Sequence, residues 1–190
     1  MIAKETGLGI GMGGSTNGST SGDEVGADLI VTSLSMAVQD PIGVNIPYKI
    51  LYDTIQQDSA GGEVSILTNG DVMINVGGYY TVSLTLTMGR DNNNGVAQLI
   101  TWGTLDFGIG DLSAVPAVEY EFDNSNQRIS NAFSNNGFFP ANSIVRGWIA
   151  RNGATNDAGL KPRVLHPDLT TAGAPNVASA VMTITGWKIT

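Results

Sequence analysis

Cysteine is absent from the 190 residues of this chain, and histidine occurs once, at His166. The absence of cysteine excludes disulfide bonds, thiolate metal sites and cysteine nucleophiles. No Gly-x-Ser-x-Gly nucleophile motif accompanies His166, which precedes Pro167. A hydrolytic triad and a surface or interface role are both open for this histidine, and the missing nucleophile motif favours the second.

Charge is scarce as well. Charged residues make up 14% of the chain, whereas roughly 25% is typical of globular proteins. Acidic residues outnumber Lys and Arg by 17 to 9, which gives a net charge of −8 and argues against phosphate neutralisation. No apolar run approaches the roughly 18 residues that a membrane helix needs, and the N-terminal stretch lacks the pattern of a secretory signal. We therefore expect neither a nucleic-acid partner nor a membrane partner.

The polarity of the chain comes mainly from Gly, Ser, Thr and Asn, while 42% hydrophobic residues suffice for one sizeable core. Residues 1–28 form a Gly/Ser-rich segment that we interpret as an extended N-terminal arm, and residues 29–190 as a single domain. Alone, such an arm buries too little apolar surface to fold, so we expect a partner to hold it. Its predicted partner-binding anchors, with glycine allowing close backbone approach, are Ile2, Leu8, Ile10 and Met12.

The arm also contains the glycine spacing of a dinucleotide-binding motif, from Gly9 to Gly14. That motif binds pyrophosphate because a strand leads into the turn and a helix N-terminus follows it. Neither element is predicted here, so a flexible or docked arm is favoured over a nucleotide site.

Residues 69–88 carry the clearest secondary-structure pattern. From Tyr80 to Met88 apolar residues alternate with hydroxyl-bearing ones, which predicts a strand with one buried face. Asn69-Gly70 favours a type I′ hairpin turn between strands at 64–67 and 71–76. No long amphipathic helix is evident, so we predict an all-β antiparallel jelly-roll sandwich. Further strands are expected at residues 29–38, 44–53, 96–102, 105–109, 118–122, 144–150 and 177–189.

Three segments together resemble the jelly-roll family of tumour necrosis factor and the complement globular head. They read IPYKILYD at 46–53, NGDVMINVGGYYTVSLTLTM at 69–88 and FFPANSIVRGWI at 138–149. Gly77-Gly78-Tyr79-Tyr80 is similar to the Gly-x-Tyr step into the central strand of that family. The strand entry at 141–145 is also similar, although the usual Gly-Asp is absent.

The resemblance covers residues 44–190 and implies a compact homotrimer with apolar strands around a threefold axis. Versions of this fold with glycine-rich N-terminal arms recur in bacteriophage virions, as capsid cement or decoration proteins and as fibre tips. This likeness to phage proteins is an analogy at the level of the fold.

Two acidic patterns have a functional and a structural interpretation. Glu119 and Glu121 lie two apart on a predicted strand and so share a face, with Asp123 following. No element that could bury them is identifiable, which favours a solvated face or a contact over catalysis. Asp91, Asn93 and Gly95 partly imitate a calcium loop, but the spacing is one residue short and no glutamate closes it. A hairpin turn explains these three residues, and no metal is predicted.

Large aromatic residues fall in or beside the predicted strands, where core or trimer-axis packing is favoured over stacking on sugar rings. Phe138 and Phe139 are adjacent and cannot face the same side of a strand, so we expect one of them to reach a neighbouring subunit. The set comprises Trp102, Trp148, Trp187, Phe107, Phe133, Phe138 and Phe139.

The sequence therefore predicts a structural protein without catalytic residues, cofactor or metal. The preferred hypothesis is a homotrimeric bacteriophage capsid cement or decoration protein on the virion surface, with the major capsid protein as its partner. The alternative is the trimeric receptor- or carbohydrate-binding head of a phage fibre. An enzyme on a jelly-roll scaffold has the least support.

Overall fold

The computed structural model describes residues 31–35, 38–58, 62–90, 97–122, 128–152, 158–161 and 178–189. Within these ranges the regular secondary structure consists of strands. No helix in the described part of the chain has the length and apolar character needed to cross a bilayer.

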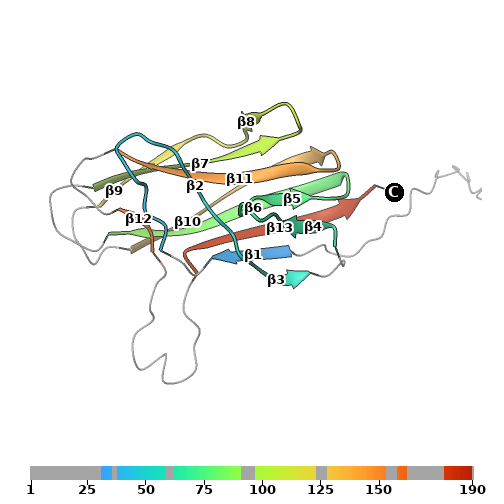
Figure 1. Ribbon diagram of the computed structural model, residues 1–190, viewed down its shortest axis with the longest axis horizontal. Coiled ribbons are helices and arrows are strands. Elements are labelled where there is room, and N and C mark those ends of the chain that lie inside the picture. Colours follow the sequence, from blue (N-terminus) through green and yellow to red (C-terminus); the bar gives the residue numbers. More distant parts are fainter. Residues whose placement is uncertain are drawn as a thin grey trace, which may run out of the picture.

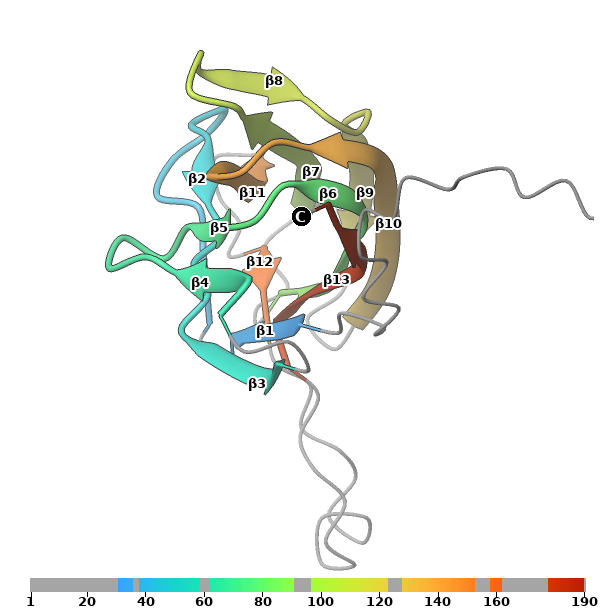
Figure 2. The same ribbon diagram turned by 90° about the vertical axis from the view of Figure 1, so that its right-hand side faces the viewer.

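The strands form two antiparallel sheets that face each other (Figures 1 and 2). The first sheet has the order β10 (Arg128–Phe139), β6 (Gly78–Gly89), β13 (Ala180–Lys188), β1 (Val31–Ser35) and β3 (Thr54–Asp58), with β12 (Gly159–Leu160) also paired to β6. The second has the order β4 (Val64–Ile66), β5 (Val72–Ile74), β11 (Ser143–Arg151), β7 (Ala97–Asp106) and β8 (Asp111–Ser113). In that sheet β2 (Tyr48–Lys49) pairs with β11, and β9 (Val118–Phe122) pairs with β7.

The core lies between the sheets and depends on the alternation in β6. Its apolar residues from Tyr80 to Met88 are at most 3% exposed, as the sequence predicts. The opposite sheet supplies the other side of the core, and each large apolar side chain buried there contributes about 1.5–3 kcal/mol. The contributing residues of that sheet include Val72, Ile74, Leu99, Val145 and Ile149.

The predicted hairpin at Asn69-Gly70 is confirmed, but its turn type is different. The Gly70 N–H donates to the Leu67 carbonyl at 2.8 Å, and the Leu67 N–H donates to the Asp71 carbonyl at 2.8 Å. Gly70 has a φ of 79°, whereas Asn69 is not among the residues with positive φ. A type I′ turn needs positive φ at both central residues, so this connection has instead the pattern of a turn closed by a glycine bulge.

The predicted strand at 44–53 is largely wrong. Only Tyr48–Lys49 pairs as a strand, and Val44 forms an isolated bridge to Arg151. Ile50 and Tyr52 enter the core, whereas Ile46 is 53% exposed, so no single face is buried. The segment crosses from the first sheet to β11 and returns as β3, and this crossing interrupts the period-two pattern (Figure 1).

Two further strand predictions need correction. The expected break between 96–102 and 105–109 does not exist, because β7 continues through Gly103 to Asp106. The sequence also gave no strand at 128–139, where the long strand β10 pairs with β6 along its whole length. Its asparagine, serine and glycine content resembles a loop, and pairing with β6 overrides these weak local preferences. The short strands β3, β8 and β12 were also unpredicted.

Two glycines allow β6 and β13 to approach closely. A Cβ on Gly78 would lie 2.4 Å from the carbonyl oxygen of Trp187, and one on Gly186 would lie 2.1 Å from that of Tyr79. Gly186 also has a φ of 149°, a conformation that other residues rarely adopt.

Candidate functional surfaces

An exposed aromatic patch, formed by Tyr79, Phe138 and Trp187, lies at one end of the first sheet. The register places Tyr79 of β6 directly between Phe138 of β10 and Trp187 of β13. The ring centroid of Tyr79 lies 5.5 Å from that of Phe138 and 6.5 Å from that of Trp187. The three residues are 49%, 50% and 54% exposed, so nothing in the described chain covers the patch.

Between Tyr79 and Thr85 of β6, the rest of this outer face carries no charged residue. Side chains between Tyr79 and Thr87 that point outward carry hydroxyls, and their partners on β10 and β13 are equally neutral. We call this surface the neutral face. Besides the aromatic patch it comprises Thr81, Ser83, Thr85, Ser130, Ala132, Ser134, Asn136, Val181, Thr183 and Thr185.

Phe138 and Phe139 point to opposite sides of β10, as predicted. Phe139 is 1% exposed and packs edge-to-face against Tyr80 and Phe107, at centroid distances of 6.1 and 6.4 Å. Phe138 points outward into the aromatic patch. Whether it reaches a neighbouring subunit stays a prediction. Phe133 packs against the core from β10.

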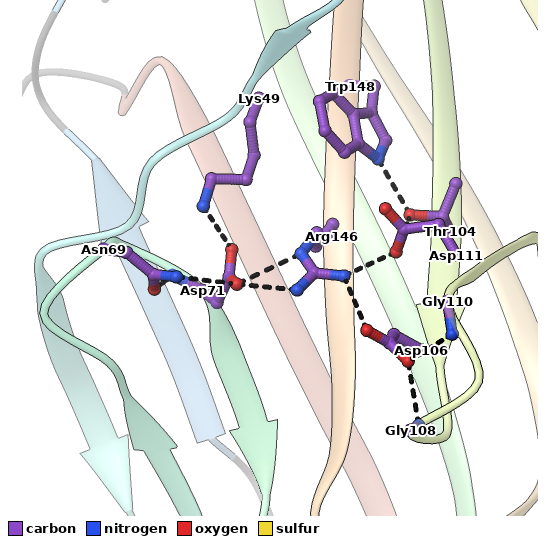
Figure 3. A network of polar contacts seen from close by, with 10 residues as sticks. All are labelled: Lys49, Asn69, Asp71, Thr104, Asp106, Gly108, Gly110, Asp111, Arg146 and Trp148. Carbon is purple, nitrogen blue, oxygen red and sulfur yellow. Dashed lines mark hydrogen bonds and ion pairs between the residues drawn. The ribbon is translucent and has the colours of Figure 1, made fainter.

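On the second sheet an ion network centres on Arg146 of β11 (Figure 3). Its guanidinium Nη1 lies 2.5 Å from Asp111 Oδ1 and 3.3 Å from Asp106 Oδ2. On its other side it donates to Asp71, whose second oxygen lies 2.6 Å from Lys49 Nζ. The network joins β2, β7, β8 and β11 with Asp71, the residue before β5, and its two cations face three carboxylates.

The network lowers the pKa values of two of its acids, Asp71 and Asp106. Burial alone would raise the pKa of Asp71, but hydrogen bonds and charge from Arg146 and Lys49 outweigh it and lower that pKa. The pKa of Asp106 is lowered first by the backbone N–H of Gly108, with further contributions from Arg146 and the N–H of Gly110. Burial would lower the pKa of Arg146, but the surrounding aspartates raise it. Paired ions of this kind stabilise the sheet and offer no free acid or base for catalysis.

No pattern in the sequence predicts this network. Arg146 and Asp71 are 75 residues apart, and only the register of β11 with its neighbours brings them together. Among the described residues no group of three or more histidine, cysteine, aspartate or glutamate side chains could hold a metal ion.

A tryptophan pair lies beside the network on the same outer face. Trp102 and Trp148 are cross-strand partners, and their rings stack with centroids 6.3 Å apart and an interplanar angle of 10°. Trp148 Nε1 donates to Thr104 Oγ1 at 2.8 Å, which fixes one indole (Figure 3). Both rings are partly exposed.

Glu119 and Glu121 project from β9 on the same face, as predicted, and both are exposed. Glu121 accepts a hydrogen bond from Gln98 Nε2 at 3.2 Å, and Glu119 accepts one from Asn152 Nδ2 at 3.3 Å. These amide contacts agree with a solvated strand face.

An open groove of about 660 Å³, which we call the hairpin groove, lies between the segment after β1 and the β4–β5 hairpin. Gln39 fixes one wall, because its amide donates to the Leu51 carbonyl at 3.0 Å and accepts from the Leu51 N–H at 2.7 Å. Val38 and Leu51 on this wall are 54% and 40% exposed. The other wall consists of residues 66–70, and Asp53 is the one charged residue in the lining.

Several residues singled out in the sequence lie outside the described ranges. They are the arm anchors Ile2, Leu8, Ile10 and Met12, the motif from Gly9 to Gly14, the loop residues Asp91, Asn93 and Gly95, and Asp123 and His166. The predictions made for them stand as predictions.

No protein-family model and no curated protein matches this chain. Among solved structures it is similar to murine APRIL at pH 5.0, with a TM-score of 0.53 and 8% identity over 84% of this chain and 99% of that one. It is equally similar to the Eiger TNF of S. frugiperda, with a TM-score of 0.53 and 8% identity over 86% of this chain and 94% of that one. At such low identity the likeness concerns the fold alone. The chain therefore has the tumour necrosis factor-like jelly-roll fold that the sequence predicts.

Proposed function

We propose that this protein is a non-enzymatic structural protein that assembles as a homotrimer through the neutral face and acts as a bacteriophage capsid cement or decoration protein. The observation that carries the proposal is the neutral face itself. It is a broad sheet surface without charge, on a chain whose net charge is −8.

Two copies of this chain should associate through the neutral face because of electrostatics. Two copies of an acidic chain repel each other wherever their charged groups meet, whereas hydroxyl and aromatic side chains meet without that cost. The half-exposed rings of Tyr79, Phe138 and Trp187 supply apolar area of the kind that dominates interface energies.

A cement role uses the trimer as a rigid clamp between capsomers. The sandwich supplies stiffness, and the arm, with Ile2, Leu8, Ile10 and Met12 as anchors, makes extended contact with the shell. The major capsid protein is the partner in this proposal, and the virion surface is the location.

The oligomeric state is tested by sedimentation equilibrium on the full chain. We expect a species of three times the 19.8 kDa chain mass. Trp187→Arg should give monomers, because it brings a charge into the neutral face. Leu112→Arg is the matched control, since Leu112 is 48% exposed on the other sheet, and it should leave the trimer intact. A monomeric wild type would overturn the assembly.

The cement role is tested by the copy number of this protein relative to the major shell protein in purified particles, measured by quantitative mass spectrometry. A ratio within a few-fold of one-to-one supports cement. A far smaller ratio contradicts it and favours a fibre tip. Deletion of residues 1–28 should abolish particle binding while the trimer persists.

The second candidate is a carbohydrate-binding head, which the Trp102–Trp148 pair favours. Partly exposed indoles beside hydrogen-bonding side chains are suited to stacking on sugar rings. Binding of the trimer to a glycan array that disappears with Trp102→Ala, and survives deletion of residues 1–28, would support this alternative.

A further inference from the structure

The hairpin groove is a largely uncharged surface that lies outside the neutral face, the proposed trimer interface. Val38 and Leu51 leave aliphatic surface open on one wall, and Ile66 and Leu67 lie partly buried on the other. Asp53, its one charged lining residue, is exposed at the surface. A neutral, extended segment with spaced aliphatic side chains could therefore enter the groove without removing a charge from water.

The arm contains such a segment. Residues 7–13 read GLGIGMG, so Leu8, Ile10 and Met12 alternate with glycine. In an extended chain these three side chains share one face and are spaced about 6.6–6.8 Å apart, while the opposite face carries no side chains. The segment has no charge, which suits a lining whose one charged residue, Asp53, stays exposed.

We infer that residues 7–13 dock into the hairpin groove of their own chain, with Leu8, Ile10 and Met12 against Val38, Leu51 and Ile66. The inference shares with the proposed function the assignment of these arm residues as apolar anchors. It names the surface that they occupy before any shell protein is present. Shell binding then competes with this internal contact, and the arm is released only to a stronger partner.

The length of the arm favours the groove of the same chain. Residues 14–30 form a linker of 17 residues with a root-mean-square span of about 21–25 Å for a glycine-rich chain. Val31, where the described chain begins, is seven residues from Val38 and so no more than about 25 Å from it. A linker of this mean length can reach a groove at such a distance, and the tether raises the effective concentration of the arm there, which favours this groove over that of another copy.

The test uses the absence of cysteine in the natural chain. Ile10→Cys is combined with Leu51→Cys, and the rate of disulfide formation under mild oxidation is followed by non-reducing electrophoresis and mass spectrometry. The matched control carries the same two cysteines with Leu8→Ser and Met12→Ser, so the tether is unchanged and the apolar anchors are removed. A second pair, Ile10→Cys with Val38→Cys, guards against a local effect of the Leu51 substitution.

We expect an intrachain disulfide that forms at least tenfold faster than in the serine control, for both cysteine pairs. Equal rates would overturn the inference. Disulfide-linked dimers from a mixture of the two single-cysteine chains, at the rate of the double variant, would also overturn it, because the arm would then occupy another copy. Repeating the measurement in the Trp187→Arg background, without shell protein, separates this outcome from failure of the trimer or of the cement role.

Discussion

Arg146 donates two hydrogen bonds to a single oxygen of Asp71, from Nε at 3.1 Å and from Nη2 at 2.9 Å. The Asp71 side chain is 1% exposed, and its other oxygen pairs with Lys49. A carboxylate this buried is stable only because two cations replace its water. The pair connects β11 to the start of β5, which makes it a structural link between parts of the chain distant in sequence.

Replacement of Asp71 should therefore destabilise the folded protein. Asp71→Asn keeps the shape but leaves two cations without their buried counter-charge, and we expect a loss of about 3 kcal/mol in the free energy of unfolding. Urea denaturation measures it. Asp53→Asn is the control, because Asp53 is exposed and bonds Thr54 beside it, and it should change the stability by less than about 0.5 kcal/mol.

The same link predicts a dependence of stability on acid. Because the pKa of Asp71 is lowered in the folded protein, the unfolded chain binds more protons at low pH. The stabilisation is complete above about pH 5 and is lost as the pH falls through 3.8 towards the folded value. The difference in unfolding free energy between wild type and Asp71→Asn should shrink over this window. Parallel pH profiles for the two proteins would contradict the assignment.

Glycine at position 186 should be irreplaceable, whereas glycine at 137 should not. An added Cβ at Gly186 would collide with the Tyr79 carbonyl, while one at Gly137 would meet nothing within 4 Å. We expect Gly186→Ala to cost about 3 kcal/mol and Gly137→Ala less than about 0.5 kcal/mol. Thermal unfolding followed by circular dichroism distinguishes them, and similar melting temperatures would contradict the close approach of β6 and β13.

Phe138 and Phe139 are adjacent on β10, but their replacement should affect stability very differently. Phe139→Ala should cost about 3–5 kcal/mol because it empties part of the core, whereas Phe138→Ala should cost less than about 1 kcal/mol of monomer stability. Both are measured by urea denaturation in the Trp187→Arg background, so that assembly does not contribute. In the otherwise natural chain Phe138→Ala should weaken the proposed trimer, and an unchanged trimer dissociation constant would argue against the neutral face as the interface.

Local pattern by itself determined part of this fold. The alternation from Tyr80 to Met88 predicted which face of β6 is buried, and the strand at 118–122 was predicted with the bounds that the structure gives. These predictions are correct because burial on one face of a strand imposes a period of two on the sequence itself. The same local rule predicted that Phe138 and Phe139 point to opposite sides.

Tertiary pairing decided the rest. β10 is a strand because β6 pairs with it along twelve residues, although its asparagines and serines favour turns. The turn at Gly70 took its bulged form as part of the hairpin, and the ion network exists only because sheet register aligns Arg146 with aspartates distant in the chain. The neutral face likewise combines three strands, and its lack of charge is a property of their register rather than of any one segment. Pairing between strands is non-local, so its consequences are visible only in the folded chain.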